Sequence, residues 1–399
     1  MKQAIKSRTF GRAIFAVVLA LSLLAFSLIE SHGSIDSAPQ YQSRETASTA
    51  RSFVYTITNA SDANSIAAYS RNAETGELTF IGTFPTGGRG TGAIVDSQSP
   101  IVANADGTRL YAVNTASNDI SVMAIRDDGS LELIGSPVPS NGIAPASLAL
   151  FDDLLYVTNK GNGSTTANYT GFRLNADELM PVRRSTVELS IGDNPGHILF
   201  NPSGDVVIGT RISGRAIDSF IVRRNSRKYG RLRPVATLRD QPGPFGAAFN
   251  PAADSQLIVS SVRLPGAASY RVFSDGAIVP VNAVGNAPER AACWVTVHPD
   301  GQFAWVANTP SNSLSLYTIN RDGSLRLEAT RSTAAFGRLP FEMAIDRAGR
   351  FLYVLHVGTQ NILALRVSQD TSSAGLEAVG AFAIPINSTP MGLVVVEKD

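Results

Sequence analysis

The chain has 399 residues, of which 44% are hydrophobic and 17% charged, and its formal net charge at pH 7 is +1. This length is enough for a large hydrophobic core, and the near-zero charge excludes a global field that would attract nucleic acid or an anionic membrane. The 34 glycines and 21 prolines lie mostly at turns between short apolar runs, which favours an all-β fold over disorder.

The N-terminal segment differs from the rest of the chain. Several lysines and arginines precede an apolar run over residues 13–29. A basic stretch followed by such a run is typical of an export signal, so residues 1–33 are predicted to be a signal peptide or, if uncleaved, a membrane anchor. Residues 34–51 are polar and without pattern, which predicts a flexible linker before a domain over 52–399. We therefore expect an extracytoplasmic location, periplasmic or secreted, with membrane contact only through an uncleaved leader.

After residue 52 the chain repeats one plan of four short apolar runs separated by turns, and residues 294–327 show it most clearly. The turns there read His-Pro-Asp-Gly at 298–301 and Arg-Asp-Gly-Ser at 321–324. Asp-Gly pairs between alternating runs predict β-hairpins, because glycine accepts the positive φ of a tight turn. One such stretch therefore predicts one four-stranded antiparallel sheet.

The plan recurs at intervals of roughly 45–55 residues, which is the period of propeller blades. The end of the second run is marked in turn by Asn59, Asn114, Asn159, Thr210, Ser260, Asn308 and His356. Seven blades are predicted, over 53–84 with 390–396, 100–135, 146–189, 195–238, 244–284, 293–330 and 340–382. The first unit lacks an inner strand and nothing follows the last strand. We therefore predict an all-β, seven-bladed β-propeller, monomeric, in which the C-terminal strand completes the first blade and closes the ring.

Two connections are longer than the plan requires. Residues 161–169 form a Gly/Ser/Thr/Asn-rich loop, and residues 223–233 (RRNSRKYGRLR) form a dense basic hairpin tip. Either the basic tip is a solvated turn held apart by charge, or it is a patch for an acidic partner or a surface polysaccharide. Its only aromatic residue is Tyr229, so we predict no nucleic-acid partner.

The stretch Tyr156-Val157-Thr158-Asn159 looks like the YVTN propeller repeat. The chain over 53–396 resembles the bacterial 6-phosphogluconolactonase and 3-carboxymuconate cyclase family of seven-bladed propellers. The matching motifs include Pro-x-x-apolar before the inner strands, the His/Asn-Pro-Asp/Ser-Gly turn and the final Pro-Met-Gly-Leu-Val-Val-Val strand. The resemblance implies ring-opening or ring-forming chemistry on lactones at the channel mouth, usually without a metal. No cofactor is expected.

The resemblance implies a four-part site, of which this chain keeps one part. His197 matches the histidine before the inner strand of the fourth blade. Pro244-Phe245-Gly246 stands where an Arg-His pair is implied, residues 259–263 (VSSVR) lack the implied glutamate, and Asn308-Thr309 replaces the implied arginine. Whether the chain is an enzyme therefore stays open. If it is one, a lactone hydrolase or a lactonizing cycloisomerase is expected.

Residues just before the inner strands should surround the axial opening. Lactone hydrolysis needs a general base and a donor or cation for the developing oxyanion. The candidate bases are His197 and Glu342, and the candidate positive groups are Arg211, Arg263 and Arg290. The candidate ligand-binding residues are Phe245, Trp294, Phe341, Arg290, His356 and Met391, because an aromatic rim can stack a flat or sugar-like ligand. Each of these residues also has a structural interpretation, and the aromatic side chains could simply plug the ring.

Two functions remain as hypotheses. In the first, the axial pocket binds a lactone or sugar-derived ligand and hydrolyses or cycloisomerises it. In the second, the propeller is a non-enzymatic interaction module whose loops over 159–169 and 223–233 hold a protein or cell-envelope partner. A cavity containing His197 and an arginine would favour the first, and an opening plugged by the three aromatic residues would favour the second. The four histidines are widely separated, so no metal site is predicted.

Overall fold

The computed structural model describes residues 51–176, 178–225, 227–368 and 375–398. The chain divides into a unit over 1–48 and a unit over 49–399. The predicted leader over 1–33, and the predicted linker over 34–51 except Arg51, lie outside the described residues. Within the described ranges, no helix has both the length and the apolar character needed to span a bilayer.

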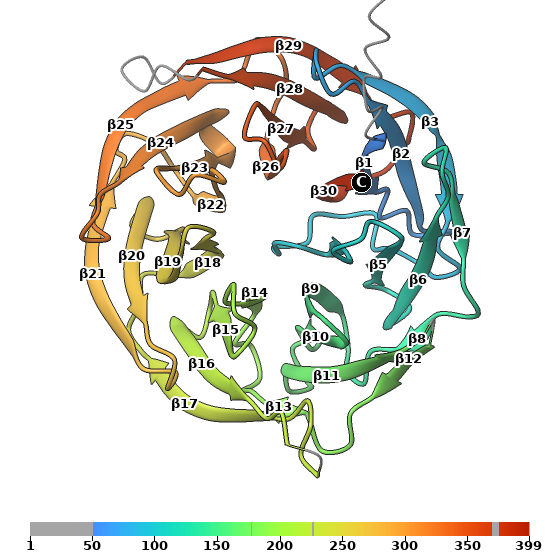
Figure 1. The fold of residues 1–399 in the computed structure, drawn as a ribbon, viewed down its shortest axis with the longest axis vertical. Helices are drawn as coiled ribbons and strands as arrows, with labels where there is room; N and C mark the ends of the chain where they lie inside the picture. The colour runs from blue at the N-terminus through green and yellow to red at the C-terminus, as the bar shows by residue number, and fades with distance from the viewer. Residues whose placement is uncertain (1–50, 177, 226, 369–374, 399) are drawn as a thin grey trace, which may run out of the picture. The chain divides into compact units, whose positions relative to one another are not determined.

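Seven antiparallel sheets surround a common centre in the second unit (Figure 1). The first sheet contains β1 (Arg51–Ile57), β2 (Ser65–Arg71), β3 (Leu78–Pro85) and β30 (Met391–Lys398). The second contains β4 (Ile101–Ala103), β5 (Arg109–Asn114), β6 (Asp119–Ile125), β7 (Leu131–Leu133) and β8 (Val138–Pro139). The third contains β9 (Pro145–Phe151), β10 (Leu154–Asn159), β11 (Asn168–Asn175), β12 (Glu178–Pro181) and β13 (Val187–Glu188).

The other four sheets each have four strands in chain order. The fourth contains β14 (Pro195–Phe200), β15 (Val206–Arg211), β16 (Ala216–Val222) and β17 (Leu232–Leu238), and the fifth contains β18 (Pro244–Asn250), β19 (Ala253–Ser261), β20 (Gly266–Val272) and β21 (Ile278–Gly285). The sixth contains β22 (Ala292–Val297), β23 (Phe303–Asn308), β24 (Ser313–Ile319) and β25 (Leu325–Ser332), with the short helix η1 (Thr309–Ser311) between β23 and β24. The seventh contains β26 (Pro340–Ile345), β27 (Phe351–His356), β28 (Asn361–Val367) and β29 (Leu376–Ala383).

The prediction of a seven-bladed all-β propeller is confirmed, and each predicted unit coincides with one sheet to within a few residues. Closure by the C-terminal strand is also confirmed, because β30 pairs antiparallel with β1, with Phe53 opposite Val396 and Tyr55 opposite Val394. This pairing covers the free edge of β1, so the ring has no open seam at this point.

Polar turn residues shape each hairpin from within. In the turn between β14 and β15, the Asn201 side chain accepts a hydrogen bond from the Val206 N–H at 2.8 Å, and Gly204 takes a φ of +75°. His298 lies in the corresponding turn of the sixth blade, as predicted, and its Nε2 lies 3.0 Å from the carbonyl of Gly349. The Asn/His-Pro-x-Gly sequence pattern therefore marks the inner turn of a blade.

The tyrosines of the second strands join neighbouring blades. In three blades the buried hydroxyl donates to a glycine carbonyl in the outer turn of the next blade, at 2.9–3.0 Å: Tyr55 to Gly129, Tyr156 to Gly230 and Tyr353 to Gly76. A buried tyrosine adds a large apolar area and needs a partner for its hydroxyl, and both requirements are met here. The last of the three bonds links the seventh blade to the first.

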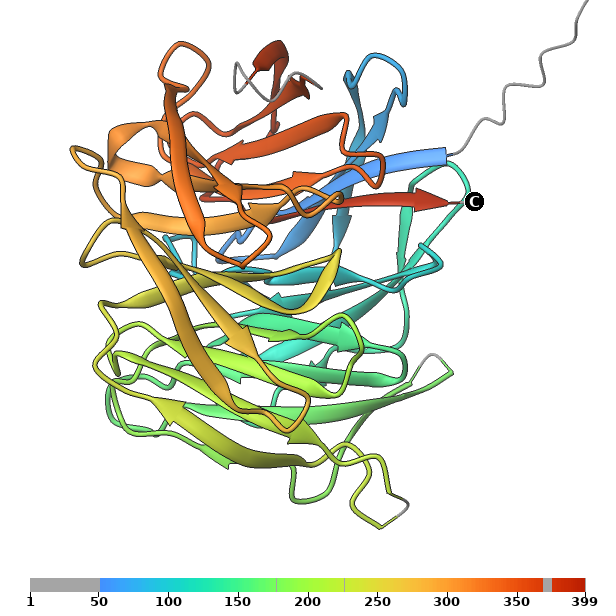
Figure 2. The same cartoon turned by 60° about the vertical axis from the view of Figure 1, so that its left-hand side comes forward.

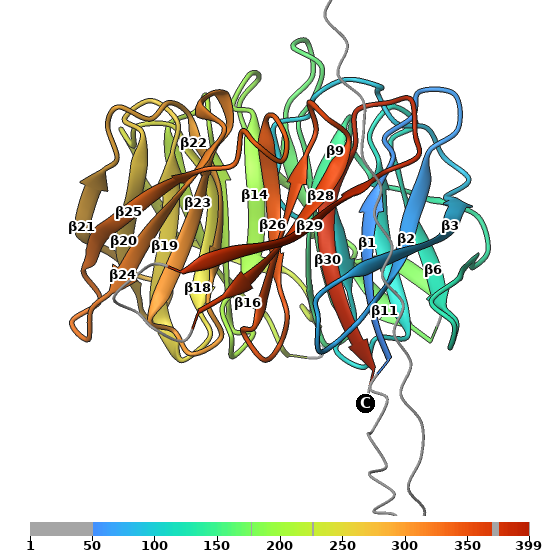
Figure 3. The same ribbon diagram turned by 90° about the horizontal axis from the view of Figure 1, so that it is seen from above.

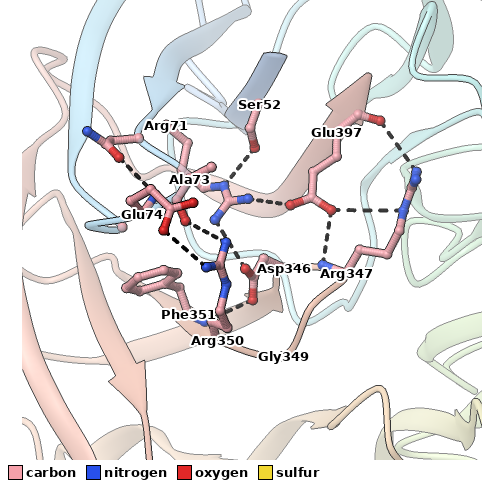
Figure 4. Close-up of polar contacts among 12 residues, drawn as sticks. Ser52, Arg71, Ala73, Glu74, Asp346, Arg347, Gly349, Arg350, Phe351 and Glu397 are labelled. Atoms are coloured by element: carbon pink, nitrogen blue, oxygen red, sulfur yellow. Dashed lines mark hydrogen bonds and ion pairs between the residues drawn. The ribbon is translucent and has the colours of Figure 1, made fainter. Parts of the chain in front are cut away.

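The closure seam also holds a buried ion-pair network (Figure 4). The Arg71 guanidinium donates from Nε to the Ser52 hydroxyl at 2.6 Å and from Nη1 to Asp346 Oδ2 at 3.2 Å, and it also contacts the Glu397 carboxylate. The side chains of Arg71 and Asp346 are 2% and 0% exposed. Because Asp346 belongs to the turn after β26 and the other three residues belong to the first sheet, this network ties the first and last blades together.

The strand order gives the ring two distinct faces. The upper face carries the connections into each inner strand and those between second and third strands, such as β3–β4 and β10–β11. The lower face carries the remaining turns, such as β16–β17, which extends beyond the sheets in Figure 2. Arg51 pairs with Lys398, so the start of β1 and the end of β30 lie together on the lower face (Figure 3).

Candidate functional site

The centre of the ring is occupied by part of the chain itself. Residues 95–99, which we name the central segment, belong to the β3–β4 connection and reach toward the axis in Figure 1. The backbone N–H of Gln98 donates to the carbonyl of Gly196 in the fourth blade at 3.0 Å. The indole N–H of Trp294 in the sixth blade donates to the carbonyl of Ser97 at 2.8 Å. The segment is therefore anchored to inner strands on different sides of the ring.

The Gln98 side chain also joins the central segment to the inner strand of the sixth blade. Its Nε2 donates to the carbonyl of Val295 at 2.9 Å, and its Oε1 accepts from the Val295 N–H at 3.2 Å. A Cβ on Gly246 would lie 2.1 Å from this Oε1, so only glycine leaves room for the amide. The buried amide thus has the hydrogen bonds that burial requires.

The three predicted rim aromatics form one buried stack beside the central segment. The ring centroids of Phe245 and Trp294 are 4.8 Å apart at 63°, and those of Trp294 and Phe341 are 4.0 Å apart at 24°. All three side chains are only 2–3% exposed. They contact one another instead of presenting an open rim, so the structure places them as part of the filled centre.

His197 and Glu342 are brought together by one residue of the central segment, Ser99. The Ser99 hydroxyl lies 3.2 Å from His197 Nε2, and the Ser99 N–H donates to Glu342 Oε1 at 2.6 Å. The Ser99 hydroxyl also interacts with the Glu342 carboxyl and lowers its pKa. We name Ser99, His197 and Glu342 the axial cluster.

The tautomer of His197 follows from its hydrogen bonds. Its Nδ1 accepts the Ala247 N–H at 3.2 Å, so the proton of the neutral ring is on Nε2, which faces Ser99. Burial lowers the pKa of His197 to about 3, so the ring is neutral at pH 7. This geometry makes His197 a hydrogen-bond donor to Ser99, whereas the sequence had suggested it as a general base.

The pKa of Glu342 is shifted in the opposite direction from that of His197. Burial raises its pKa to about 8, against the opposing effect of Ser99, and its Oε2 has no partner among the described residues. A carboxyl group that titrates near neutral pH is suited to proton transfer. Of the two bases suggested by the sequence, the geometry therefore favours Glu342.

Ser99 is the member of the axial cluster that a ligand can reach. It is partly exposed, whereas His197 and Glu342 are 3% and 4% exposed. Its φ is +59°, a left-handed conformation that is uncommon outside glycine and is often associated with functional sites. Ser99 could not be predicted from the sequence, because the β3–β4 connection carries no recognisable motif.

The predicted arginines lie apart from the axial cluster. Arg211 forms ion pairs of 2.9 Å with both Asp193 and Asp218, which neutralise its charge inside the fourth blade. Arg263 and Arg290 are exposed on upper-face loops. In the described part of the chain, no contact joins any of the three to His197 or Glu342. The described contacts therefore do not include the pairing of His197 with an arginine that would favour the first function.

Lys160 supplies a cation that the sequence analysis missed. Its Nζ donates to Asn194 Oδ1 at 2.6 Å and to the carbonyl of Pro195 at 2.9 Å, directly before the strand that carries His197. Burial lowers the pKa of Lys160 to about 8, and the neighbouring charge of Asp96 in the central segment opposes that shift. A positive group thus lies beside the central segment on the upper face.

The other candidates have structural contacts. His356 is fully buried, its Nε2 lies 3.0 Å from the Thr333 hydroxyl, and burial lowers its pKa to about 4. Met391 is 4% exposed and belongs to the core between the first two blades. Cys293 is buried, and its thiol pKa is raised to about 12, as expected of a structural cysteine. Within the described ranges, no three His, Cys, Asp or Glu side chains are grouped to hold a metal.

A family model described as "Lactonase, 7-bladed beta-propeller" matches residues 168–381. The chain belongs to this lactonase family. Among curated relatives, the 6-phosphogluconolactonase of Yersinia pseudotuberculosis serotype O:3 (strain YPIII) is 20% identical over 331 residues, covering 80% of this chain and 78% of that protein. The 6-phosphogluconolactonase of Bacillus subtilis (strain 168) is 21% identical over 329 residues, with the same coverage.

Solved structures show the same fold. A candidate 6-phosphogluconolactonase from Bacteroides fragilis NCTC 9343 aligns with a TM-score of 0.72 at 18% identity, covering 88% of this chain and 99% of that one. The periplasmic gluconolactonase of Pseudomonas aeruginosa aligns with a TM-score of 0.68 at 16% identity, covering 87% and 99%. The family match includes His197 and Glu342, but it begins after the central segment.

The filled centre explains one departure from the lactonase pattern. Gly246 belongs to the Pro-Phe-Gly stretch that stands where the resemblance implied an Arg-His pair. Gly246 leaves room for the Gln98 side chain, and Phe245 is the first ring of the aromatic stack. The substituted stretch and the central segment therefore fit each other.

The raised pKa of Glu342 predicts a pH-dependent stability. Because the folded pKa is about 8 and the ordinary value is 4.5, the native state holds a proton that the unfolded state releases. The stabilisation that protonated Glu342 adds to the free energy of unfolding is complete below about pH 4.5 and is lost as the pH rises to about 8. Between pH 5 and pH 8, the free energy of unfolding of wild type should fall by about 3–5 kcal/mol more than that of Glu342→Gln. Urea denaturation at several pH values measures this difference, and parallel curves would contradict it.

Proposed function

We propose that this propeller binds a small, sugar-derived lactone at the upper end of its filled centre and hydrolyses it through Ser99. The observation that carries the proposal is the position of Ser99, which is partly exposed: its hydroxyl lies against the His197 ring and its N–H donates to the buried Glu342 carboxyl. Membership of the lactonase family supports a lactone as the substrate class. The names of relatives, 6-phosphogluconolactonase and gluconolactonase, support a sugar-derived one.

In the proposed reaction Glu342, in its carboxylate form, takes the hydroxyl proton as Ser99 Oγ bonds to the lactone carbonyl carbon. The oxyanion that forms accepts a hydrogen bond from the neutral His197 ring, and the ammonium of Lys160 adds positive charge nearby. Collapse of the tetrahedral intermediate breaks the ring C–O bond, and the proton moves from Glu342 to the ring oxygen. Water then hydrolyses the acyl-serine and regenerates Ser99.

The export signal predicted over residues 1–33 leads us to propose that this activity is extracytoplasmic. A periplasmic location is part of the name of the Pseudomonas aeruginosa protein that shares the fold. A lactone that reaches the upper face from the surrounding medium would not need to cross the filled centre.

Ser99→Ala and Glu342→Gln are expected to lower the rate of lactone hydrolysis by about 100-fold or more, because each removes a proton-transfer or bond-forming group. Proton release from a panel of aldonolactones, including glucono-δ-lactone, measures the rate. The wild-type rate should rise as the pH rises through about 8, because the carboxylate form of Glu342 is the base. Mass spectrometry of a quenched reaction should find the acyl group on Ser99.

Ser97→Ala is the matched control, because the Ser97 hydroxyl is buried without a partner among the described residues, two positions away in the same segment. This variant should keep the wild-type rate. Equal rates for Ser99→Ala and wild type would remove Ser99 from the mechanism. A folded wild type that turns over none of the lactones would overturn the proposal.

The filled centre supports a second candidate, an interaction propeller without enzymatic activity. The stacked aromatics and Gln98 are buried among the inner strands, and an opening plugged by the aromatic residues is the arrangement expected for such a module. The two loops suggested for a partner lie on opposite faces, since the β10–β11 connection is on the upper face and the β16–β17 connection on the lower. One partner would therefore use one loop, and the basic hairpin lines a cavity of about 480 Å³.

A further inference from the structure

The basic hairpin between β16 and β17 is docked against the third blade. Gly230, with a φ of +72°, accepts a hydrogen bond from the Tyr156 hydroxyl at 2.9 Å, and a Cβ there would lie 2.8 Å from Leu154. The Tyr229 hydroxyl donates to Asp153, at the start of the third blade's second strand. These contacts hold the Tyr229–Gly230 part of the hairpin against the third blade.

The hairpin and the β11–β12 edge border an open cavity of about 480 Å³. Four arginines line it, namely Arg173, Arg183, Arg227 and Arg231, and no acidic residue does among those described. Asp153 is the nearest acid by contact, since it pairs with Arg173 at 2.8 Å. The lining residues themselves therefore carry positive charges and no negative charge. This is a local excess in a chain whose formal net charge is +1.

The arginines are partly fixed before any ligand arrives. The Arg173 guanidinium lies over the Tyr229 ring at 4.9 Å, and Arg231 Nε donates to the carbonyl of Arg183 at 3.0 Å. Arg183 and Arg227 are exposed, and no hydrogen bond or ion pair of their guanidinium groups occurs within the described residues. Planar guanidinium groups recognise carboxylates and sulfates through paired hydrogen bonds, so two such groups remain available to a ligand.

The rest of the cavity wall is apolar or aromatic. Met180 is 49% exposed and continues into Pro181 and Val182, and the Tyr229 ring forms another part of the wall. An acidic sugar has C–H faces that contact such surfaces, and it also has acidic groups that pair with arginine. A volume of this size lies within the range for small-ligand sites, and the cavity opens on the lower face, away from the axial cluster.

We propose that this cavity binds one or two acidic sugar units of an anionic polysaccharide, such as a uronate or sulfated chain. The site is on the opposite face from the lactone site, so it does not depend on the proposed hydrolase activity. Charge complementarity selects an anion, and the aromatic and apolar wall favours a sugar over an acidic peptide.

The test is binding of the full protein to polygalacturonate and to heparin, with dextran as the neutral polymer and polyglutamate as the acidic peptide. Arg183→Gln/Arg227→Gln should weaken binding to both acidic polysaccharides by about tenfold or more, because two charge-assisted contacts are lost. Binding of wild type should also fall as salt is added. The Tyr156–Gly230 and Tyr229–Asp153 contacts are left intact, so the variant should melt at the wild-type temperature.

Arg271→Gln/Arg321→Gln is the matched control. These arginines line the corresponding outer cavity of the fifth and sixth blades, where Asp322 is also present. The control should change the affinity for polygalacturonate by less than about twofold. An equal loss of affinity in both double variants, or unchanged binding in Arg183→Gln/Arg227→Gln, would show that this cavity is not the binding site. If polyglutamate bound as tightly as the polysaccharides, the assignment of a sugar as the ligand would be wrong, and an acidic protein would be indicated instead.

Discussion

A chain that ends at Pro390 is expected to lose cooperative folding. The missing strand, β30, supplies the inner strand of the first blade, and its Met391, Leu393 and Val396 are at most 4% exposed. Leu393 belongs to the core next to the seventh blade, whereas Met391 and Val396 belong to the core next to the second. Burying three such side chains contributes roughly 5–9 kcal/mol. That is comparable with the whole stability of a typical protein, about 5–15 kcal/mol.

Soluble yield and thermal unfolding by circular dichroism measure the effect. A circular permutant is the control, with Lys398 joined to Arg51 by a short Gly-Ser linker and new ends opened in the turn at 321–323. Arg51 and Lys398 are paired neighbours, so the linker needs to span little. The permutant keeps every strand and should fold. A truncated chain that melts like wild type would show that the C-terminal strand is not what holds the ring closed.

The second large effect is expected from Arg71→Met, at about 3–5 kcal/mol of lost stability. The variant leaves the buried carboxylate of Asp346 without its cation, and an unpaired buried charge costs far more than a lost surface pair. Guanidinium denaturation measures the change in the free energy of unfolding. Arg51→Met is the matched control in the same sheet, because Arg51 and Asp127 are 52% and 81% exposed, and it should cost less than about 1 kcal/mol.

The cause can be separated from the lost packing with a double variant. Arg71→Met/Asp346→Asn removes the unpaired negative charge at position 346. The amide oxygen introduced there can still accept the Phe351 N–H, which Asp346 accepts at 2.8 Å. Asn201 makes the equivalent bond in the fourth blade at 2.8 Å. The double variant should therefore recover part of the stability. Equal losses in Arg71→Met and Arg51→Met would show that the network contributes no more than a surface pair.

The fold could be predicted because its determinants are local and repeated. Asp-Gly turns, alternating runs and the Asn/His-Pro-x-Gly turn act within a few residues, and their recurrence gives the number of blades. The unmatched strands at the two ends, 53–59 and 390–396, predicted closure, since an open edge is costly. The boundaries of the seven sheets follow these patterns closely.

The candidate site was predicted only in part. His197 and Glu342 could be found because each lies at the start of an inner strand, and strand starts must meet at the axis. Ser99 and Gln98 could not be found, because they belong to an irregular connection whose course no sequence motif sets. The ion pairs of Arg211 with Asp193 and Asp218 could not be predicted, since its sequence neighbours do not show that both carboxylates pair with it.

The seven blades, their order and the strand that closes them follow from the sequence, because hairpin geometry and hydrophobic alternation depend on residues close together in the chain. The residues that occupy the axis, and the groups that meet there, are known only from the folded ring. Ser99 reaches Glu342 across 243 positions of sequence and His197 across 98. The protonation of these groups is likewise set by burial and by hydrogen bonds from other blades, which exist only once the ring has closed.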